Sequence, residues 1–138
     1  MHPIVKGSIF GIFMTISSWH YGASFDCAKA SSVSENLICT DYELSQKDDE
    51  LNLVFQQARS IFGNDSEFRK NNIDAWKWRE ANCFDKTCLL RWYSSRKIYF
   101  ESMLSTQNFQ QNQNDIRAAK CIRLGLAPGS RDYKECIR

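Results

Sequence analysis

Cysteine is the residue type in this sequence whose number and spacing point most clearly to chemistry. The chain of 138 residues contains six of them: Cys27, Cys39, Cys83, Cys88, Cys121 and Cys136. A zinc site commonly uses cysteine pairs separated by about two to four residues; Cys83 and Cys88 have four residues between them, but Cys27 and Cys39 have eleven. A thioredoxin-like redox site needs Cys-x-x-Cys, which the sequence lacks. We therefore interpret the six cysteines as three disulfides and expect no metal site and no cofactor.

The N-terminal residues have the features of a secretory signal peptide. A basic start, "MHPIVK", precedes an uncharged apolar run from Gly7 to Trp19. A run of about 13 residues suits a signal peptide and is too short to span a bilayer. Small residues in "HYGAS" predict cleavage near Ala23 or Ser24. We therefore assign residues 1–23 as the signal peptide and expect an exported chain with no membrane span, in an oxidising compartment that favours disulfides.

Histidine is absent from the predicted mature chain, because His2 and His20 both lie in the leader. This excludes histidine-based general acid–base catalysis and the usual Ser-His and Cys-His nucleophile pairs. Paired carboxylates, as in glycoside hydrolysis, would be the remaining route to an enzyme. No carboxylate pair is singled out by its spacing, so we expect no catalytic residue and no enzyme activity.

The hydrophobic periodicity predicts an all-α fold. Capping boxes formed by Ser32 with Glu35 and by Thr40 with Glu43 open a short helix and a long one, and the long helix stops at Gly63. Asn64 and Asp65 open a helix that ends near Asn82, and Asp85 opens a third long helix. No segment alternates with the period of a strand. The expected buried positions are Leu44, Leu51, Phe55, Ala58, Phe62, Phe68, Ile73, Ala75, Trp76, Leu89, Trp92, Tyr93, Phe100 and Met103.

The composition divides the mature chain into three parts. Residues 24–104 form the helical domain, and residues 105–114, which are rich in amides, are predicted to be a linker or frayed helix end. Residues 115–138 predict a small helical hairpin around a Gly/Pro turn, with Ser130 capping the last helix. Cys121 and Cys136 flank this turn and predict a bridge that closes it. The expected architecture is a small disulfide-stapled helical bundle or hairpin with this C-terminal appendage.

The other two bridges follow from the expected helical hairpin. A helix of about 22 residues is roughly 33 Å long, and a short turn returns the next helix beside it. Cys39 should then lie near Cys83, with Cys27 and Cys88 one step further out at the same end. This geometry favours nested bridges, Cys39–Cys83 and Cys27–Cys88, over crossed ones.

Charge is distributed unevenly along the chain. Residues 24–65 carry eight acidic and three basic residues, whereas residues 66–138 carry eight acidic and fourteen basic residues. The two halves could pack against each other, or the first could present an acidic patch to a basic partner. The candidate partner-binding carboxylates are Asp41, Glu43, Asp48, Asp49 and Glu50.

Basic and aromatic residues also lie together in a pattern seen in nucleic-acid binding. The basic members are Lys77, Arg79, Arg91, Arg96 and Lys97. An exported chain rarely meets nucleic acid, and Trp76 and Trp92 lie on faces that need a core. We expect no nucleic-acid partner.

Two segments resemble the LprI-type lysozyme-inhibitor family of exported bacterial proteins. They are "FDCAKA…SENLICTDYELSQKDDELNLVF" and "AWKWREANC…CLLRWYSSRKIYFESM". The positions that carry the resemblance are Phe25, Asp26, Cys27, Ala30, Glu35, Ile38, Cys39, Asp41, Leu44, Trp76, Arg79, Cys83, Cys88, Leu89, Tyr93 and Arg96. The region beyond Ser105 lies outside the pattern.

The resemblance implies a helical, disulfide-bonded protein of the bacterial periplasm or exterior whose founding activity is to bind and inhibit lysozyme. We therefore predict an exported binding protein with a protein partner, lysozyme or another hydrolase. The alternative is a non-inhibitory interaction module of the envelope. The shared positions look structural, and ion pairs with the acidic helix are expected for Arg79 and Arg96.

Overall fold

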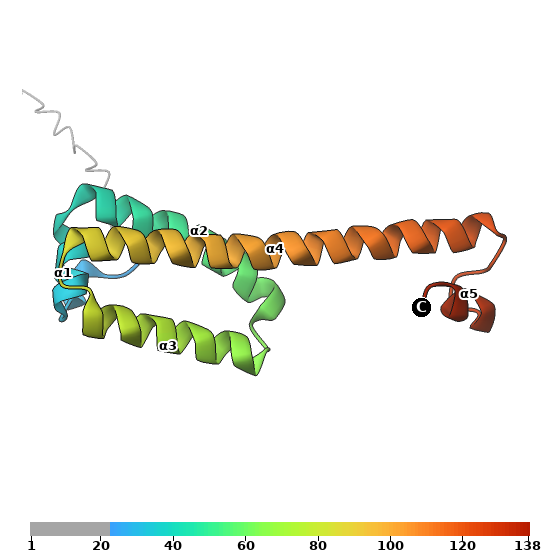
Figure 1. Ribbon diagram of the computed structural model, residues 1–138, viewed down its shortest axis with the longest axis horizontal. Coiled ribbons are helices and arrows are strands. Elements are labelled where there is room, and N and C mark those ends of the chain that lie inside the picture. Colours follow the sequence, from blue (N-terminus) through green and yellow to red (C-terminus); the bar gives the residue numbers. More distant parts are fainter. Residues whose placement is uncertain (1–22) are drawn as a thin grey trace, which may run out of the picture.

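The computed structural model describes residues 23–138, and this part of the chain contains helices and no strand (Figure 1). The prediction of an all-α fold is confirmed. The predicted leader lies, apart from Ala23, outside the described residues. The elements are η1 (Cys27–Lys29), α1 (Val33–Thr40), α2 (Tyr42–Phe62), α3 (Ser66–Asn82), α4 (Lys86–Arg123) and α5 (Arg131–Cys136).

The first two helices begin at side-chain caps, one of which differs from the prediction. Ser32 Oγ accepts the Glu35 N–H over 3.0 Å, and Glu35 Oε2 accepts the Ser32 N–H over 3.1 Å, so the first capping box is confirmed. The second box, between Thr40 and Glu43, is wrong. Asp41 caps α2 instead, because its backbone is extended and its carboxylate accepts an N–H of the first turn. Thr40 belongs to the last turn of α1.

The starts of the later helices follow the sequence closely. Asp65, Asp85 and Ser130 cap α3, α4 and α5 through their side-chain oxygens. Gly63 ends α2 as predicted. A Cβ atom at Gly63 would lie 2.5 Å from the Arg59 carbonyl oxygen, so a larger residue would need the backbone to shift.

Helices α3 and α4 each run antiparallel to the helix before them, and α1 lies across one end of α2, α3 and α4 (Figure 1). The helices meet at three phenylalanines, one from each. The ring centroids of Phe55 and Phe100 are 5.5 Å apart, those of Phe55 and Phe68 are 6.2 Å apart, and those of Phe68 and Phe100 are 6.1 Å apart. Such aromatic contacts add to the stability gained by burying the rings. Around them lie the other buried apolar residues, Ile38, Leu44, Leu51, Ala58, Cys83, Leu89 and Tyr93.

The buried face of α3 differs from the predicted one. Ile73 and Trp76 were expected in the core, yet both are about half exposed, whereas Arg79 is buried. With about 100° per residue, Arg79 lies within about 20° of Phe68 around the helix, while Ile73 is displaced by about 140° and Trp76 by about 80°. The helix therefore buries the long aliphatic stem of an arginine in place of these two apolar residues.

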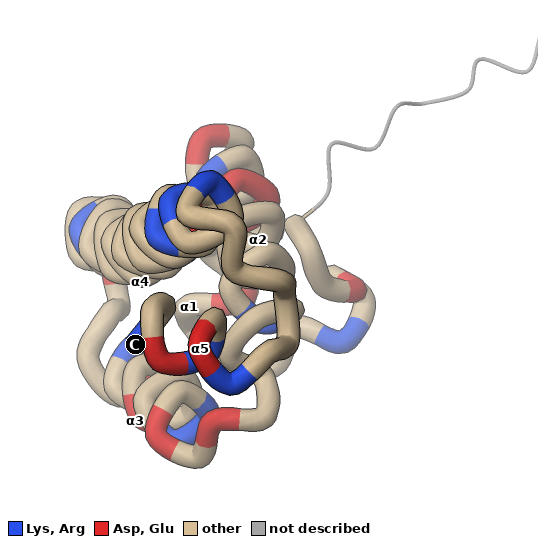
Figure 2. The backbone as a smooth tube through the Cα atoms, turned by 90° about the vertical axis from the view of Figure 1, so that its right-hand side faces the viewer, with Lys and Arg blue, Asp and Glu red and all other residues tan. Residues whose placement is uncertain are grey.

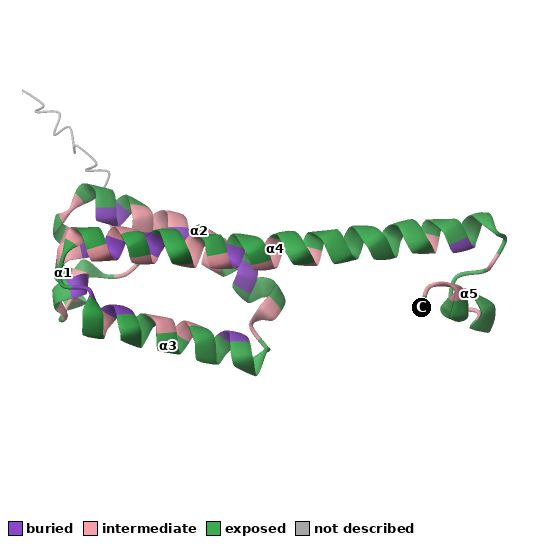
Figure 3. Cartoon of the chain, in the orientation of Figure 1, coloured by how far each residue is buried: buried purple, intermediate pink, exposed green. Residues whose placement is uncertain are grey.

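Helix α4 has 38 residues and is about 57 Å long at about 1.5 Å per residue. Its second half is exposed beyond the bundle (Figure 3). Residues 105–114, predicted as a linker or frayed end, are a continuous part of this helix. They contain no Gly or Pro, and hydrogen bonds such as Gln111 Nε2 to Asp115 Oδ1 (3.0 Å) support the turns beyond them. None of the described helices has a stretch that is long and apolar enough to cross a membrane.

The C-terminal hairpin folds back beside the end of α4, as Figure 2 shows in a view along that helix. Gly125 and Gly129 have φ angles of 84° and 87°, a region that glycine enters without steric cost. The turn brings Cys121 and Cys136 together, with their Cα atoms 6.1 Å apart, so the predicted bridge is confirmed.

The other two predicted bridges are wrong. Cys27 pairs with Cys39 and Cys83 pairs with Cys88, with Cα–Cα distances of 5.8 Å and 5.2 Å. The helical hairpin forms nonetheless, and both bridges lie at the expected end. The reason is local: η1 folds back against the end of α1, and the turn between α3 and α4 is short enough to place Cys88 over Cys83. Each of these cysteines therefore bonds to the cysteine next to it in the sequence and not to one on another part of the bundle.

Candidate functional site

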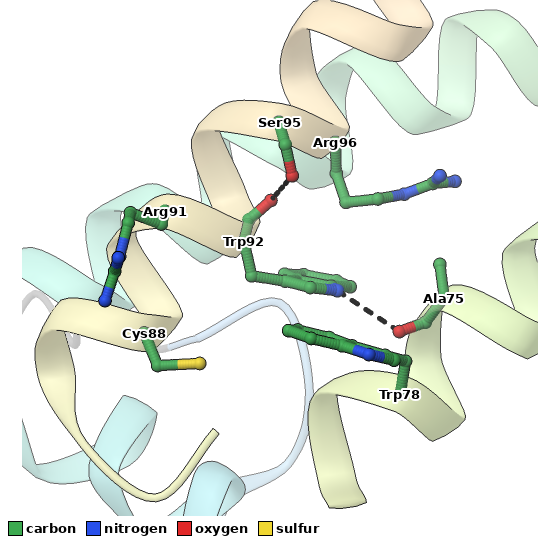
Figure 4. Close-up of a pocket in the computed structure, with 7 residues that line it drawn as sticks. All are labelled: Ala75, Trp78, Cys88, Arg91, Trp92, Ser95 and Arg96. Atoms are coloured by element: carbon green, nitrogen blue, oxygen red, sulfur yellow. Dashed lines mark hydrogen bonds between the residues drawn. The ribbon is translucent and has the colours of Figure 1, made fainter. Parts of the chain in front are cut away.

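A cleft of about 600 Å³ lies between α3 and α4. Figure 4 shows its walls: side chains of α3 on one side and those of the first turns of α4 on the other. The lining residues are Ala75, Trp78, Cys88, Arg91, Trp92, Ser95 and Arg96. We call this the tryptophan cleft.

One indole of the tryptophan cleft is fixed and the other is open to solvent. Trp92 donates its Nε1–H to the Ala75 carbonyl over 3.1 Å, which ties α4 to α3. The Arg79 guanidinium lies 5.0 Å from the Trp92 ring centroid and adds a cation–π contact. Trp78 is 53% exposed. A rigid ring and an accessible ring therefore form an apolar surface that a ligand could cover.

Two arginine side chains flank the indoles, Arg91 on the side of Cys88 and Arg96 on the opposite side (Figure 4). Arg91 is exposed, and its Nε–H donates a long hydrogen bond, 3.4 Å, to the Thr87 carbonyl. Arg96 donates to the side-chain oxygens of Asn71 (2.9 Å) and Asn72 (2.6 Å), and burial lowers the pKa of its guanidinium. Within the described chain neither arginine has a carboxylate partner, so both leave their positive charge uncompensated at the cleft.

A disulfide forms the end wall of the tryptophan cleft. Cys88 lines it, and its bridge to the buried Cys83 joins the end of α3 to the first turn of α4. Ser34 of α1 holds the same corner, since its hydroxyl donates to the Cys83 carbonyl over 3.1 Å. The bridge therefore sets the relative position of the helices that carry Trp78 and Arg91.

Most carboxylates of the predicted acidic surface form ion pairs with lysines of the same chain. Lys86 Nζ lies 2.9 Å from Asp41 Oδ2 and 2.8 Å from Glu43 Oε2. Hydrogen bonding from Lys86 lowers the pKa of Asp41, and the same bond raises the pKa of Lys86. Glu50 pairs with Lys47 at 3.0 Å. The Lys86 contacts join the acidic and basic halves, whereas the pair of Glu50 and Lys47 lies within the acidic half.

The remaining two carboxylates of that predicted surface do not form a solvent-facing pair. Asp48 is only 7% exposed and accepts hydrogen bonds from Ser24 and Tyr93. Asp49 is partly buried, and burial followed by the charge of Asp48 raises its pKa. The structure thus does not bring Asp41, Glu43, Asp48, Asp49 and Glu50 together as one exposed patch.

The expected ion pairs of Arg79 and Arg96 with the acidic helix are also absent from the described residues. Arg79 pairs with its neighbour Glu80 at 2.6 Å. Arg96 lies over Tyr99 and Phe100, 4.5 Å and 4.7 Å from their ring centroids. The guanidinium groups of both arginines contact nearby residues of α3 and α4 instead of the carboxylates of α2.

The sequence pattern predicted no role for Trp78 and marked Arg91 only as a nucleic-acid candidate, so the tryptophan cleft was not predicted. A signal was available in "WKW". Residues two apart on a helix are rotated by about 200° about the helix axis, so they lie on nearly opposite faces. Trp76 and Trp78 therefore cannot both face one core.

Residues 23–138 contain no group of three or more His, Cys, Asp or Glu side chains arranged to hold a metal ion. No family model, curated protein or solved structure matches this chain.

Proposed function

We propose that this protein is an exported, non-catalytic protein-interaction module and that the tryptophan cleft is its contact surface. The observation that carries the proposal is that one cleft is lined by the half-exposed Trp78 and by two arginines, Arg91 and Arg96, that have no carboxylate partner among the described residues. Tryptophan and arginine are the residues most enriched among those that dominate protein–protein binding energies.

The partner's chemistry follows from charge complementarity. Because the amide oxygens of Asn71 and Asn72 orient Arg96 without cancelling its charge, a carboxylate of the partner can complete the site. The indoles of Trp78 and Trp92 favour an aromatic or large apolar side chain next to that carboxylate. We therefore propose a partner segment that is acidic and carries an aromatic residue.

The resemblance to LprI-type inhibitors offers lysozyme as another partner. An acidic surface on α2 would have suited that basic enzyme, but Asp41, Glu43 and Glu50 pair with lysines and Asp48 is buried. This internal neutralisation favours the non-inhibitory module over the inhibitor.

The test uses a random peptide library displayed on phage, selected against the disulfide-bonded protein. Enriched peptides should combine Asp or Glu with an aromatic residue, and a synthetic copy should bind at least tenfold more weakly to Trp78→Ala. The matched control is Trp76→Ala, two residues away, 48% exposed and outside the tryptophan cleft.

A second control tests whether peptide binding depends on the arginines of the tryptophan cleft or on the positive charge of the chain in general. Arg91→Gln with Arg96→Gln should weaken the synthetic peptide's binding, whereas Arg117→Gln with Arg123→Gln, at the far end of α4, should not. Selection of basic peptides, or equal losses in both double variants, would contradict the proposal. So would inhibition of lysozyme by wild type and Trp78→Ala alike, because the inhibitory surface would then lie elsewhere.

A further inference from the structure

Asp48 is the buried carboxylate of α2, and both of its oxygens are engaged. The Tyr93 hydroxyl donates to Oδ1 over 2.9 Å. Oδ2 accepts two hydrogen bonds from Ser24, one from the backbone nitrogen at 2.7 Å and one from Oγ at 2.6 Å. A single residue at the start of the described chain thus provides all the donors of one carboxylate oxygen.

The basic side chains that line hollows beside Asp48 have other partners, and Arg96, in one of these hollows, is held by Asn71 and Asn72. A shallow hollow beside Asp48 is lined by Asp26, Lys29, Glu35 and Arg79, among others, and Asp49 and Tyr93 are its further titratable neighbours on α2 and α4. Arg79 pairs with Glu80, and Lys29 pairs with Asp26. No basic side chain in residues 23–138 lies within salt-bridge distance of Asp48. A positive charge supplied at Ser24 would therefore meet an acceptor already in place.

Ser24 is well placed to supply that charge. The residue is exposed, while its nitrogen points inward to the buried carboxylate. If the chain began at Ser24, the same nitrogen would be an ammonium at the same position. A start at Phe25 would remove both donors, and a start at Ala23 would leave this nitrogen an uncharged amide.

We propose that the Ala23–Ser24 peptide bond is a processing site and that the freed Ser24 α-ammonium forms a buried ion pair with Asp48. A membrane-bound endopeptidase of the signal-peptidase class would hydrolyse the bond with one water molecule. Ala23 gains the hydroxyl and leaves as a carboxylate, and the Ser24 nitrogen gains a proton and takes up a second at neutral pH. The proposal depends on the predicted leader and is independent of the tryptophan cleft.

The site of processing is tested by expressing the full chain, residues 1–138, in a bacterial host and measuring the intact mass of the exported protein. The mass of residues 24–138 with three disulfides is expected. A product that begins at Ala23 or Phe25, or a chain that keeps its leader, would overturn the assignment.

The ion pair is tested by comparing a protein that begins at Ser24 with one that begins at Gly22, both with the natural sequence. A hydrogen bond to a charged donor is stronger than one between an amide and the same carboxylate, so the equilibrium constant for unfolding should be about tenfold smaller for the Ser24 form near pH 7. The folded α-amine should have a pKa above its ordinary value of about 7.7–8.0. The advantage is therefore complete below that range and is lost as the pH rises through the folded pKa.

Two further measurements decide the result. Asp48→Asn in both forms should abolish the difference between them. If that variant does not fold, an NMR titration of the Ser24 α-amine in the wild-type form replaces it. A titration at the ordinary pKa, or equal stability of the two forms at every pH, would overturn the ion pair even if processing at Ser24 is confirmed.

Discussion

The Tyr93 hydroxyl donates a hydrogen bond to Asp48 Oδ1 over 2.9 Å, which links α4 to α2 through two buried side chains 45 positions apart. Burial first, and the charge of Asp48 second, raise the pKa of Tyr93, so the hydroxyl stays protonated and remains a donor. The contact favours one register of the two helices, since an apolar residue at either position would remove this hydrogen bond.

Tyr93→Phe tests this polar link within the core. The substitution keeps the ring and leaves one carboxylate oxygen of Asp48 without a donor, so the free energy of unfolding should fall by about 1–3 kcal/mol. Urea unfolding followed by circular dichroism measures it. Tyr42→Phe makes the same chemical change at a side chain that is 60% exposed and should cost less. An equal decrease in the free energy of unfolding in the two variants would show that the buried hydroxyl contributes no more to stability than the exposed one.

Peptide mapping tests the disulfide pattern. Trypsin cuts after Lys29, after Lys86 and after Arg123, and so separates the two cysteines of every pair. Non-reduced digests should contain three linked peptides, each joining cysteines that are neighbours in sequence. The denatured protein should have no titratable thiol. A peptide that links Cys39 to Cys83 would restore the nested pattern and contradict the structure.

The ion pair at the start of α4 makes a prediction about titration. In Lys86→Gln the pKa of Asp41 should rise toward 3.8, yet stay below it because Asp41 still caps α2. Since the folded pKa of Asp41 is lowered, its contribution to stability is present above about pH 4 and is lost as the pH falls through the folded value. NMR titration of the Asp41 carboxyl carbon in both proteins measures the change. An identical pKa in the two would mean that the ion pair does not form in solution.

A truncation tests whether the C-terminal arm, residues 111–138, contributes to the bundle. The last residues of α4 near the core are Met103 and Leu104, and Phe100 is the last core residue. A chain that ends at Gln110 should therefore unfold with a Tm within a few degrees of the full chain, with a smaller helical signal. A loss of more than about 5 °C, which corresponds to roughly 1 kcal/mol, would show that the arm supports the core.

Four helix starts and the end of α2 were predictable because they depend on residues close in sequence. Ser32, Asp65, Asp85 and Ser130 act as caps where the pattern placed them, and Gly63 stops α2. The aromatic contact of Phe55, Phe68 and Phe100 also follows from helical periodicity. The bridge between Cys121 and Cys136 was predictable because a single turn separates them.

The bridges at the other end and the tryptophan cleft were harder to predict because they depend on backbone paths and on neighbouring helices. The path of η1 decides that Cys27 meets Cys39, and no pattern of apolar residues reports that path. The burial of Arg79 displaces Trp78 to the outside, and this follows only once α4 supplies Trp92 as the cover for the guanidinium. A charge count likewise could not show that Asp48 faces inward.

The length of α4 has a consequence for assembly. Ser95 in the tryptophan cleft and Cys121 in the disulfide-closed hairpin belong to one uninterrupted helix, and their separation of 26 positions corresponds to about 39 Å. A small globular domain is about 30 Å across. Two such proteins could therefore be held at the two ends at once without colliding, and the rigid rod would fix the distance between them.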